Sequence, residues 1–356
     1  MTSSHQDRPM IALAMGDPAG IGQELLVRLL TDPDLQDVAD ILVIGDRLAV
    51  ELGEQQAGLD ANLPDLEGFV EHGRALANLG HLDPPEVMIG QSSESGGNFS
   101  LVNFRVALRL GAAGIADAVA FTPFNKHSMR LAEADYVDEI GFIKRTIGAD
   151  KDGSEFNILD EFWNARVTSH IPLSEVAGHI TKERVEQSIE LTIESMQAVG
   201  YDRPRLAVSG LNPHAGDGGN FGREDLDIIE PTVKAAAARQ LSVEGPFSPD
   251  TVFLRAKAGL HDAVLTMYHD QGQIAMKLIG FDRGITLIGG YPFPITTPAH
   301  GTAFDIAGQG IANPGAAKRA IEIGADMARK FSSETSFPDR KTRLEAIRAF
   351  FRGGRA

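Results

Sequence analysis

The sequence predicts an α/β protein of two domains with a largely parallel sheet, and three observations lead to this fold class. Short apolar runs alternate with segments of helical spacing along most of the 356 residues, as in proteins with parallel sheets. The apolar runs are nearly continuous, which is typical of strands covered on both faces. A chain of this length also exceeds one ordinary hydrophobic core, so two domains are expected.

The individual elements follow from the position of each apolar run. Strands are expected at 10–16, 40–46, 117–123, 205–213 and 262–270, and helices at 22–30, 99–115 and 223–240. The strand at 117–123 ends at Pro123, which cannot continue a central strand. Residues 149–157 (ADKDGSEFN) are polar and contain glycine, so they are expected to form a surface connection.

The composition restricts the partners that the protein can have. Lysine and arginine number 33 against 49 acidic residues, which gives a formal net charge of −16. Nucleic acid and membrane surfaces are therefore not expected as partners, whereas a small anionic substrate could bind in a locally basic pocket. The sequence has no cysteine, which leaves histidine and carboxylates as ligands for any metal. The expected compartment is the cytoplasm.

Polar, glycine-rich clusters follow nearly every predicted strand, at the end where α/β sheets bind ligands. Three of these clusters carry a histidine: His170 in TSHIP, His214 in LNPHAGDGG and His269 in YHDQG. Three neutral imidazoles that meet at one point would bind a divalent metal and leave positions for substrate or water. The spacing alone is equally compatible with three unrelated loop histidines. Comparable candidates are His127, His261 and His300.

The loop GDPAGIGQE after the first predicted strand is rich in glycine. Its glycines lack the GxGxxG spacing of a dinucleotide fingerprint, and a tight turn between strand and helix explains at least one of them. Asp17, at the tip of the strand, is then a candidate for binding the substrate. Lys126 and Lys277 are the candidate cations for an anionic substrate, although most lysines are solvated surface charges.

Several strings occur in a fixed order along the chain: MGDPAGIGQE, TPFNK, TSHIPL, LNPHAGDGGNFGRE, GPFSPDTVF, MYHDQGQIAMK and HGTAFDIAGQGIA. In this order they resemble the strings of the 4-hydroxythreonine-4-phosphate dehydrogenase family of vitamin B6 synthesis. The resemblance runs from about residue 10 to about residue 330, which is nearly the whole chain. The strings that carry the histidines are its most specific part.

The resemblance implies a fold of the isocitrate/isopropylmalate dehydrogenase type, with two α/β domains and a central cleft. The first domain would be discontinuous, with residues 1–125 and about 290–356, and the second would span about 126–289 and form the dimer. The family's active site lies at the interface of a homodimer. Its members oxidise a secondary alcohol β to a carboxylate with NAD or NADP, and the β-keto acid then loses carbon dioxide.

The family's metal ligands fall on His170, His214 and His269, and the metal would be Zn²⁺, Mn²⁺, Co²⁺ or Mg²⁺. Such a cation acidifies the substrate hydroxyl and stabilises the developing alkoxide. The string YHDQG would therefore supply the third metal ligand and its support at the end of a strand.

The resemblance also implies roles for residues around the metal. Asp250 in SPDTVF matches an aspartate of the family's cleft and would orient or deprotonate the substrate. Lys126 is a second candidate base, and Lys277 is a candidate for both catalysis and substrate binding. The cofactor would lie along the HGTAFDIAG loop, with Thr302 and Asp305 nearest to it.

The sequence departs from the family pattern where the substrate phosphate would bind. The family string GHTE, whose histidine and threonine hold the phosphate, is replaced by YVDE at 136–139. Thr286 takes the place of an asparagine and Ile295 that of an arginine, whereas Lys277 is retained. An anion beside Asp138 would be disfavoured, and the lost contacts are strong ones. We therefore expect a non-phosphorylated hydroxy acid, such as a sugar acid or a carboxylated diol.

Two other functions remain open at this point. One is the vitamin B6 enzyme itself, with an unusual phosphate pocket. The other belongs to a different class: a binding or regulatory protein that has kept the fold and lost turnover. The retention of the three histidines, Asp250 and both lysines favours an enzyme, because a pure binding protein does not need a complete set of metal ligands and bases.

Overall fold

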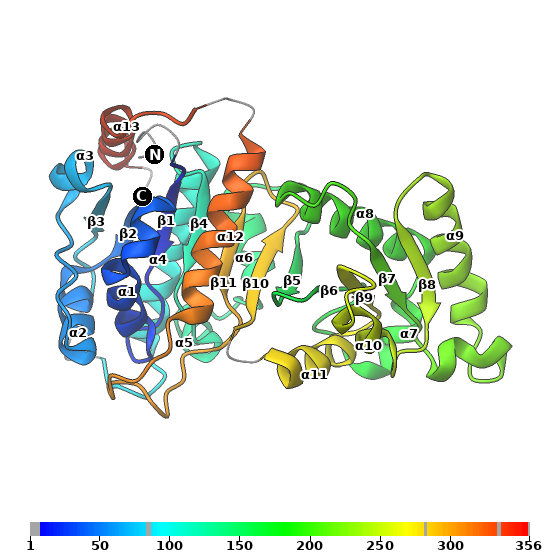
Figure 1. The fold of residues 1–356 in the computed structure, drawn as a ribbon. Helices are drawn as coiled ribbons and strands as arrows, with labels where there is room; N and C mark the ends of the chain where they lie inside the picture. The colour runs from blue at the N-terminus through cyan, green and yellow to red at the C-terminus, as the bar shows by residue number, and fades with distance from the viewer. Residues whose placement is uncertain (1–7, 83–86, 281–282, 333–335, 355–356) are drawn as a thin grey trace. The chain divides into compact units, whose positions relative to one another are not determined.

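The structure is a computed structural model that describes residues 8–82, 87–280, 283–332 and 336–354. The chain divides into two compact units, drawn in Figure 1. The first unit comprises Met1–Gly153 and Tyr291–Ala356, and the second comprises Ser154–Gly290. Both units combine mainly parallel strands with helices, which confirms the predicted α/β class. No helix in the described part of the chain is long and apolar enough to cross a membrane.

The strands of the first unit run parallel in the order β3-β2-β1-β4-β11. Their bounds are Met10–Ala14 (β1), Asp40–Gly45 (β2), Arg74–Asn78 (β3), Ala118–Phe121 (β4) and Ile295–Pro298 (β11). β1, β2 and β4 are buried along their whole length, as their apolar runs predict. Because β1 pairs with β2 on one side and with β4 on the other, the carboxyl ends of β1 and β4 form the switch point at which such sheets bind ligands.

The helices of the first unit begin at side-chain caps in several places. Their bounds are Gly22–Thr31 (α1), Arg47–Ala57 (α2), Phe69–His72 (α3), Glu94–Ala112 (α4), Lys126–Ala132 (α5), Glu139–Ile147 (α6), Gly315–Phe331 (α12) and Arg340–Arg352 (α13). Ser93, Asn125 and Asp138 cap α4, α5 and α6, and each accepts a main-chain N–H three residues on. Because α5 and α6 pack against α4, the first unit continues to Gly153, beyond the boundary at residue 125 that the sequence suggests.

The second unit has strands in the order β10-β5-β6-β9-β7-β8. Their bounds are Ser154–Ile158 (β5), Trp163–Arg166 (β6), Leu206–Ser209 (β7), Val243–Phe247 (β8), Ala263–Thr266 (β9) and Ile285–Gly289 (β10). β5 is antiparallel to both β10 and β6, whereas β6, β9, β7 and β8 are parallel to one another. The helices are Val176–His179 (α7), Lys182–Ala198 (α8), Glu230–Ala238 (α9), Val252–Lys257 (α10) and His269–Gly280 (α11).

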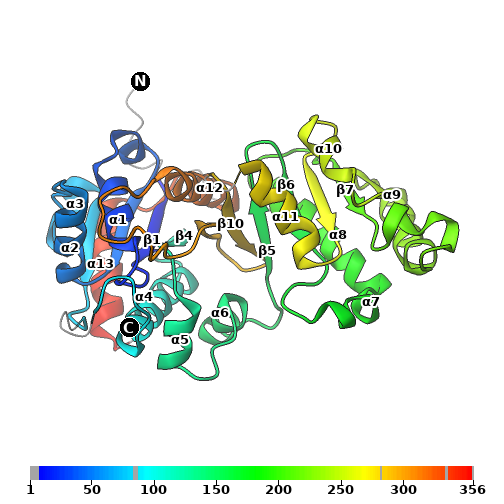
Figure 2. The ribbon, with the colours of Figure 1, turned by 90° about the horizontal axis from the view of Figure 1, so that it is seen from below.

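Different helices cover the two faces of the second unit's strands, and Figure 2 shows α11 lying across β6. Met276 of α11 packs in one core with Val264 of β9. On the other face, a Cβ at Gly289 of β10 would contact the hydroxyl of Ser195 in α8, at 2.9 Å. The face under α11 is the one that carries the candidate site.

Three details of the predicted elements are wrong. The surface connection expected at 149–157 contains β5 from Ser154 onwards, because the polar side chains of this strand pair with others on the sheet. The strand expected at 262–270 ends at Thr266, and His269 already opens α11. The helix expected at 223–240 contains a π-helical turn, Asp225–Ile229, before α9.

Candidate active site

Two of the predicted metal ligands meet in the second unit, at the carboxyl ends of neighbouring parallel strands. β6 ends at Arg166 and β9 at Thr266, and these two residues are paired in register. His170 follows β6 in the chain, and His269 is the first residue of α11. The centroids of the two imidazole rings lie 5.6 Å apart, with their planes inclined by 44°. This separation is compatible with a cation about 2 Å from one nitrogen of each ring.

The residues of the string HDQG, His269 to Gly272, form the start of α11, and each has a structural role there. Nδ1 of His269 lies 2.7 Å from a carboxylate oxygen of Asp270, which leaves Nε2 for a metal. The side-chain amide of Gln271 bonds the main-chain N–H after β9 and the carbonyl after β7, at 2.7 and 2.9 Å. A Cβ at Gly272 would lie 2.0 Å from the side-chain oxygen of Asn164, so only glycine allows α11 to approach β6 this closely.

His214 occupies a loop of unusual backbone conformation, Pro213–Gly219. His214 itself has a φ of 55°, and the residues that follow it to Gly218 also have positive φ, a conformation that costs free energy in residues other than glycine. The buried carboxylate of Asp225 fixes the start of this loop. It accepts the main-chain N–H groups of Leu211 and Asn212 at 2.8 and 3.1 Å.

Asp250, the predicted base, lies near His214. The hydroxyl of Ser248 donates a hydrogen bond to Asp250, which lowers the pKa of that carboxyl, and His214 acts in the same direction. Within residues 8–82, 87–280, 283–332 and 336–354, no three His, Asp or Glu side chains lie close enough to hold a metal ion. The chain thus brings His170 and His269 together, and it places His214 with Asp250.

In the first unit, Asp17 lies at the switch point between β1 and β4. Its side chain is fully buried; one carboxylate oxygen accepts the N–H of Ala19 at 2.9 Å, and the other has no partner among the described residues. Burial raises the pKa of Asp17. A Cβ at Gly20 would lie 2.7 Å from the Cβ of Thr302, so this glycine lets the loop after β1 pack against the predicted cofactor loop.

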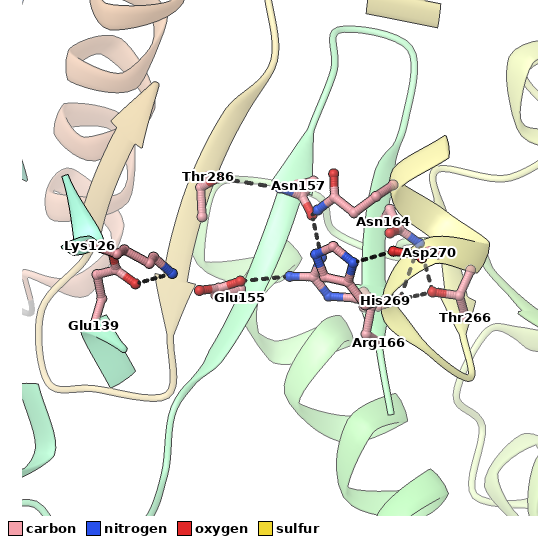
Figure 3. Close-up of polar contacts among 12 residues, drawn as sticks. Lys126, Glu139, Glu155, Asn157, Asn164, Arg166, Thr266, His269, Asp270 and Thr286 are labelled. Atoms are coloured by element: carbon pink, nitrogen blue, oxygen red, sulfur yellow. Dashed lines mark hydrogen bonds and ion pairs between the residues drawn. The ribbon is translucent and has the colours of Figure 1, made fainter. Parts of the chain in front are cut away.

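Lys126 and Glu139 form an ion pair in the first unit, shown in Figure 3. Nζ of Lys126 lies 2.9 Å from a carboxylate oxygen of Glu139, whose side chain is 10% exposed. Asp138 accepts the N–H of Gly141 at 2.8 Å and thereby caps α6. Val137 is exposed. Of the residues in place of the family's GHTE string, Asp138 and Glu139 therefore have local structural partners, and Val137 faces solvent.

The other predicted residues occupy different surroundings. Ile295 is fully buried in β11, and Thr302 is buried and accepts the N–H of Ile21 at 3.0 Å through its main-chain oxygen. Asp305 is exposed in the cofactor loop, and Lys277 is exposed on α11. Thr286 is half-buried on β10 and is paired in register with Asn157 of β5.

Sequence reasoning missed a polar network on the face of the second unit's strands, shown in Figure 3. Arg166 bonds Glu155 at 2.8 Å and the side-chain oxygen of Asn157 at 3.0 Å. Burial lowers the pKa of the Arg166 guanidinium, and Glu155 opposes this change. The signal is present in SEFNI and WNAR, where polar and apolar residues alternate as they do in strands.

Comparisons with known proteins give the class and the family of this chain. The family model described as "Pyridoxal phosphate biosynthetic protein PdxA" matches residues 37–324. A relative from Rhizobium meliloti (strain 1021), "Putative 4-hydroxythreonine-4-phosphate dehydrogenase 2", is 53% identical over 340 residues, which are 93% of this chain and 98% of that protein. The chain is an enzyme of the dehydrogenase class, which acts on a CH–OH group. It belongs to the PdxA family, as the strings predict.

Solved structures support the same fold. The 4-hydroxythreonine-4-phosphate dehydrogenase of Klebsiella pneumoniae is 32% identical with a TM-score of 0.78, over 92% of this chain and all of that chain (100%). A terephthalate 1,2-cis-dihydrodiol dehydrogenase from Burkholderia xenovorans LB400 is 27% identical with a TM-score of 0.62, over 89% of this chain and 98% of that chain. The likeness therefore extends to a dehydrogenase with a non-phosphorylated substrate in its name.

Proposed function

We propose that this protein is a metal- and NAD(P)-dependent dehydrogenase that oxidises a secondary alcohol β to a carboxylate and then releases carbon dioxide. The observation that carries the proposal is the pair formed by His170 and His269 at the carboxyl ends of β6 and β9. The carboxylate of Asp270 on Nδ1 of His269 supports it, because histidines that bind metals commonly carry such a partner. These groups fit a divalent cation such as Zn²⁺, Mn²⁺, Co²⁺ or Mg²⁺.

The chain's own residues would share the remaining chemistry. A bound divalent metal would acidify the substrate hydroxyl and stabilise the negative charge that develops, and a bound NAD(P) would accept the hydride. Asp250, whose lowered pKa keeps it ionised, is the candidate that orients the hydroxyl or takes its proton. Lys277 is the candidate cation for the anionic end of the substrate. Loss of carbon dioxide then breaks the bond between the carboxylate and the α-carbon of the β-keto acid.

We propose further that the third ligand, His214, completes the site in a homodimer. α11 carries His269 and also exposes two apolar side chains, Ile274 at 61% and Leu278 at 82%. Large apolar side chains next to each other on one helix favour a protein–protein contact. We expect a second copy of the chain to pack against this face of α11.

For the substrate, we propose a non-phosphorylated hydroxy acid or carboxylated diol. Three positions at which the family would hold phosphate carry no positive charge: Val137 is exposed, Asp138 caps α6, and Ile295 is buried in β11. The likeness to the terephthalate dihydrodiol dehydrogenase favours the same class. The second candidate is 4-hydroxythreonine 4-phosphate, which the name of the Rhizobium meliloti relative favours.

An assay of paired substrates tests the proposal. 4-Phosphohydroxy-L-threonine, 4-hydroxy-L-threonine and the cis-dihydrodiol of terephthalate would each be supplied with NAD and Mn²⁺, and then with NADP, while NADH or NADPH and carbon dioxide are followed together. We expect turnover of a non-phosphorylated compound. Turnover of the phosphate ester alone would make the protein a vitamin B6 enzyme. A protein that binds these compounds without producing reduced cofactor would belong to the class of binding proteins.

A pair of histidine variants tests the metal within the same assay. His170→Ala should abolish turnover and bound metal together, because it removes one of the two paired ligands. His179→Ala, at the end of α7, is the matched control and should retain both. Full activity of His170→Ala would contradict the metal role.

A further inference from the structure

The loop that carries His214 has a left-handed backbone from His214 to Gly218. Three residues of this stretch have a side chain: His214, Ala215 and Asp217, with φ of 55°, 52° and 44°. In the described part of the chain, only three other non-glycine residues have a positive φ, and no two of those are neighbours. A left-handed residue with a Cβ costs free energy, and such strain persists only where the surroundings impose it. Other groups must therefore hold this loop against its own preference.

The carboxylate of Asp225 binds the loop at the point where it leaves β7. Asp225 is 1% exposed, and one of its oxygens accepts the N–H of Leu211 at 2.8 Å. The other oxygen accepts the main-chain N–H of Asn212 at 3.1 Å and its side-chain amide at 2.9 Å. A Cβ at Gly210 would lie 2.7 Å from the carboxylate, so only glycine allows this close approach. Asp225 also opens a π-helical turn, a feature that is frequent at functional sites.

Gly210, at the base of the loop, is fixed relative to two other parts of the candidate site. Its N–H donates to the main-chain oxygen of Phe247 at 2.7 Å, at the end of the strand that leads to Asp250. Its main-chain oxygen accepts the side-chain amide of Gln271, in α11, at 2.9 Å. Because both the N–H and the carbonyl of Gly210 are anchored, the location of His214 depends on the hand of the loop that follows.

We propose that Asp225 is a positioning residue for His214, and that its carboxylate selects the left-handed form of the loop in which the imidazole can bind a divalent cation. The inference rests on the proposed function, because it takes His214 as a metal ligand. Asp225 is not a ligand itself and acts through the main chain of Leu211 and Asn212. Without its carboxylate the loop relaxes, so only a fraction of the molecules keeps His214 in place. The apparent affinity for metal falls by that fraction.

The affinity for Zn²⁺, measured without substrate or NAD(P) by competition with a chromophoric chelator, tests the positioning role. Asp225→Asn replaces one of the two acceptor oxygens by an amide that faces an N–H group. It should weaken Zn²⁺ binding by about 10- to 100-fold, as for the loss of a hydrogen bond to a charged group. Asp227→Asn is the matched control, because Asp227 lies in the same π-helical turn and pairs at the surface with Arg223. It should bind Zn²⁺ within about twofold of the parent protein.

A glycine within the loop separates positioning from general damage. Ala215→Gly removes the Cβ at a left-handed position and so lowers the cost of the conformation. In the Asp225→Asn background it should restore Zn²⁺ affinity by about fivefold or more. In the parent protein it should change the affinity by less than about twofold, because the loop is already in place. The absence of recovery in the double variant would overturn the inference, since a damaged site gains nothing from a more flexible loop.

A second pair of variants leaves Asp225 intact. The side chain of Asp217 is exposed, so its replacement does not disturb a core. Asp217→Asn removes the charge but keeps a residue type that tolerates the left-handed conformation, whereas Asp217→Val removes the same charge and is disfavoured there. We therefore expect Asp217→Val to bind Zn²⁺ about fivefold or more weakly than Asp217→Asn. Equal affinities in these two variants would overturn the dependence of metal binding on the hand of the loop.

Hydrogen exchange in the absence of metal distinguishes a failure of this inference from a failure of the proposed function. The N–H groups of Ala215 and Phe221 donate to main-chain oxygens of Asn212 and Gly216. Peptides that cover residues 211–222 should therefore exchange about tenfold faster in Asp225→Asn and return towards the parent rate in the double variant with Ala215→Gly.

Two combinations of results are decisive. Faster exchange in Asp225→Asn with unchanged Zn²⁺ affinity would mean that Asp225 holds the loop but that His214 does not bind the metal, and the proposed three-histidine site would then be wrong. Loss of Zn²⁺ from His170→Ala, with neither exchange nor affinity altered in Asp225→Asn, would overturn the inference and leave the proposed function intact.

Discussion

Nζ of Lys126 lies 2.9 Å from a carboxylate oxygen of Glu139, so a candidate cation of the first unit already has an anionic partner. The lysine side chain is 41% exposed, whereas the glutamate side chain is 10% exposed. A largely buried acid next to a partly solvated lysine reduces the positive potential that Lys126 presents to a ligand. We therefore expect this pair to oppose the binding of a phosphorylated substrate at Lys126.

Removing the acid should favour the phosphorylated ligand. Glu139→Gln leaves Lys126 without its counter-charge, and we expect affinity for 4-phosphohydroxy-L-threonine to rise about three- to tenfold relative to 4-hydroxy-L-threonine. The affinity for the dianionic phosphate ester should rise more than the affinity for the compound without a phosphate group. Glu133→Gln is the control, because Glu133 pairs with Arg105 and Arg145 in the same unit. An unchanged ratio of the two dissociation constants would show that Lys126 does not face the ligand.

Asp270 should tune the affinity for metal without being a ligand itself. Its carboxylate lies 2.7 Å from Nδ1 of His269, and loss of such a partner commonly costs 10- to 100-fold in metal affinity. Asp270→Asn should therefore bind Zn²⁺ more weakly by about that factor, measured by competition with a chromophoric chelator. Asp202→Asn, at an exposed position of the same unit, should have no effect. Equal metal affinity in both variants would show that Asp270 does not support metal binding.

Strands that are buried on both faces of the sheet can be predicted from the sequence alone. β1, β2 and β4 are buried on both faces, so apolar runs alone reveal them. β5 could not be predicted in this way, because Glu155 and Asn157 are polar and resemble loop residues. They belong to a strand only because Arg166, on the strand beside them, satisfies both. The pairing depends on strand register, which a pattern within one segment does not determine.

Some residues of the candidate site could likewise be placed from the sequence, and others could not. His170 and His269 could be placed together from the sequence, because the carboxyl ends of neighbouring parallel strands meet at one edge. The position of His214 depends on a left-handed loop held by Asp225, and no local pattern reveals that conformation. The partner of Lys126 was also hidden, since Glu139 stands on a different helix.

Removal of one partner of a buried ion pair near the carboxyl terminus should strongly destabilise the first unit. Arg340 of α13 bonds Asp40, at the start of β2, through Nε and Nη2, and both side chains are under 10% exposed, at 9% and 3%. Arg340→Met leaves Asp40 buried without a counter-charge, which should reduce the free energy of unfolding by about 3–5 kcal/mol. Urea unfolding measures the change.

A second arginine of α13 provides the comparison. Arg348 pairs with Glu67 at 3.2 Å, but both side chains are exposed, at 43% and 76%. Arg348→Met should therefore cost less than about 1 kcal/mol. Equal losses in the two variants would mean that the buried pair is no stronger than a surface one.

The buried carboxyl of Asp17 should make stability depend on pH. Burial raises the pKa of Asp17 above its ordinary value of 3.8, so the folded protein holds this proton more tightly than the unfolded chain does. The stabilising contribution of the protonated form is complete below pH 3.8, and it is lost as the pH rises through the raised value. An asparagine amide does not titrate, so Asp17→Asn should gain stability over the parent protein as the pH rises from 3.8 towards neutrality, measured as the difference in urea midpoints. Asp150→Asn, at an exposed position, should show no such trend. A difference for Asp17→Asn that stays constant with pH would mean that folding does not raise the pKa of Asp17. A difference that falls with pH would mean that the folded protein stabilises the charged carboxylate, and a cation bound to its unpartnered oxygen would then be the first explanation to test.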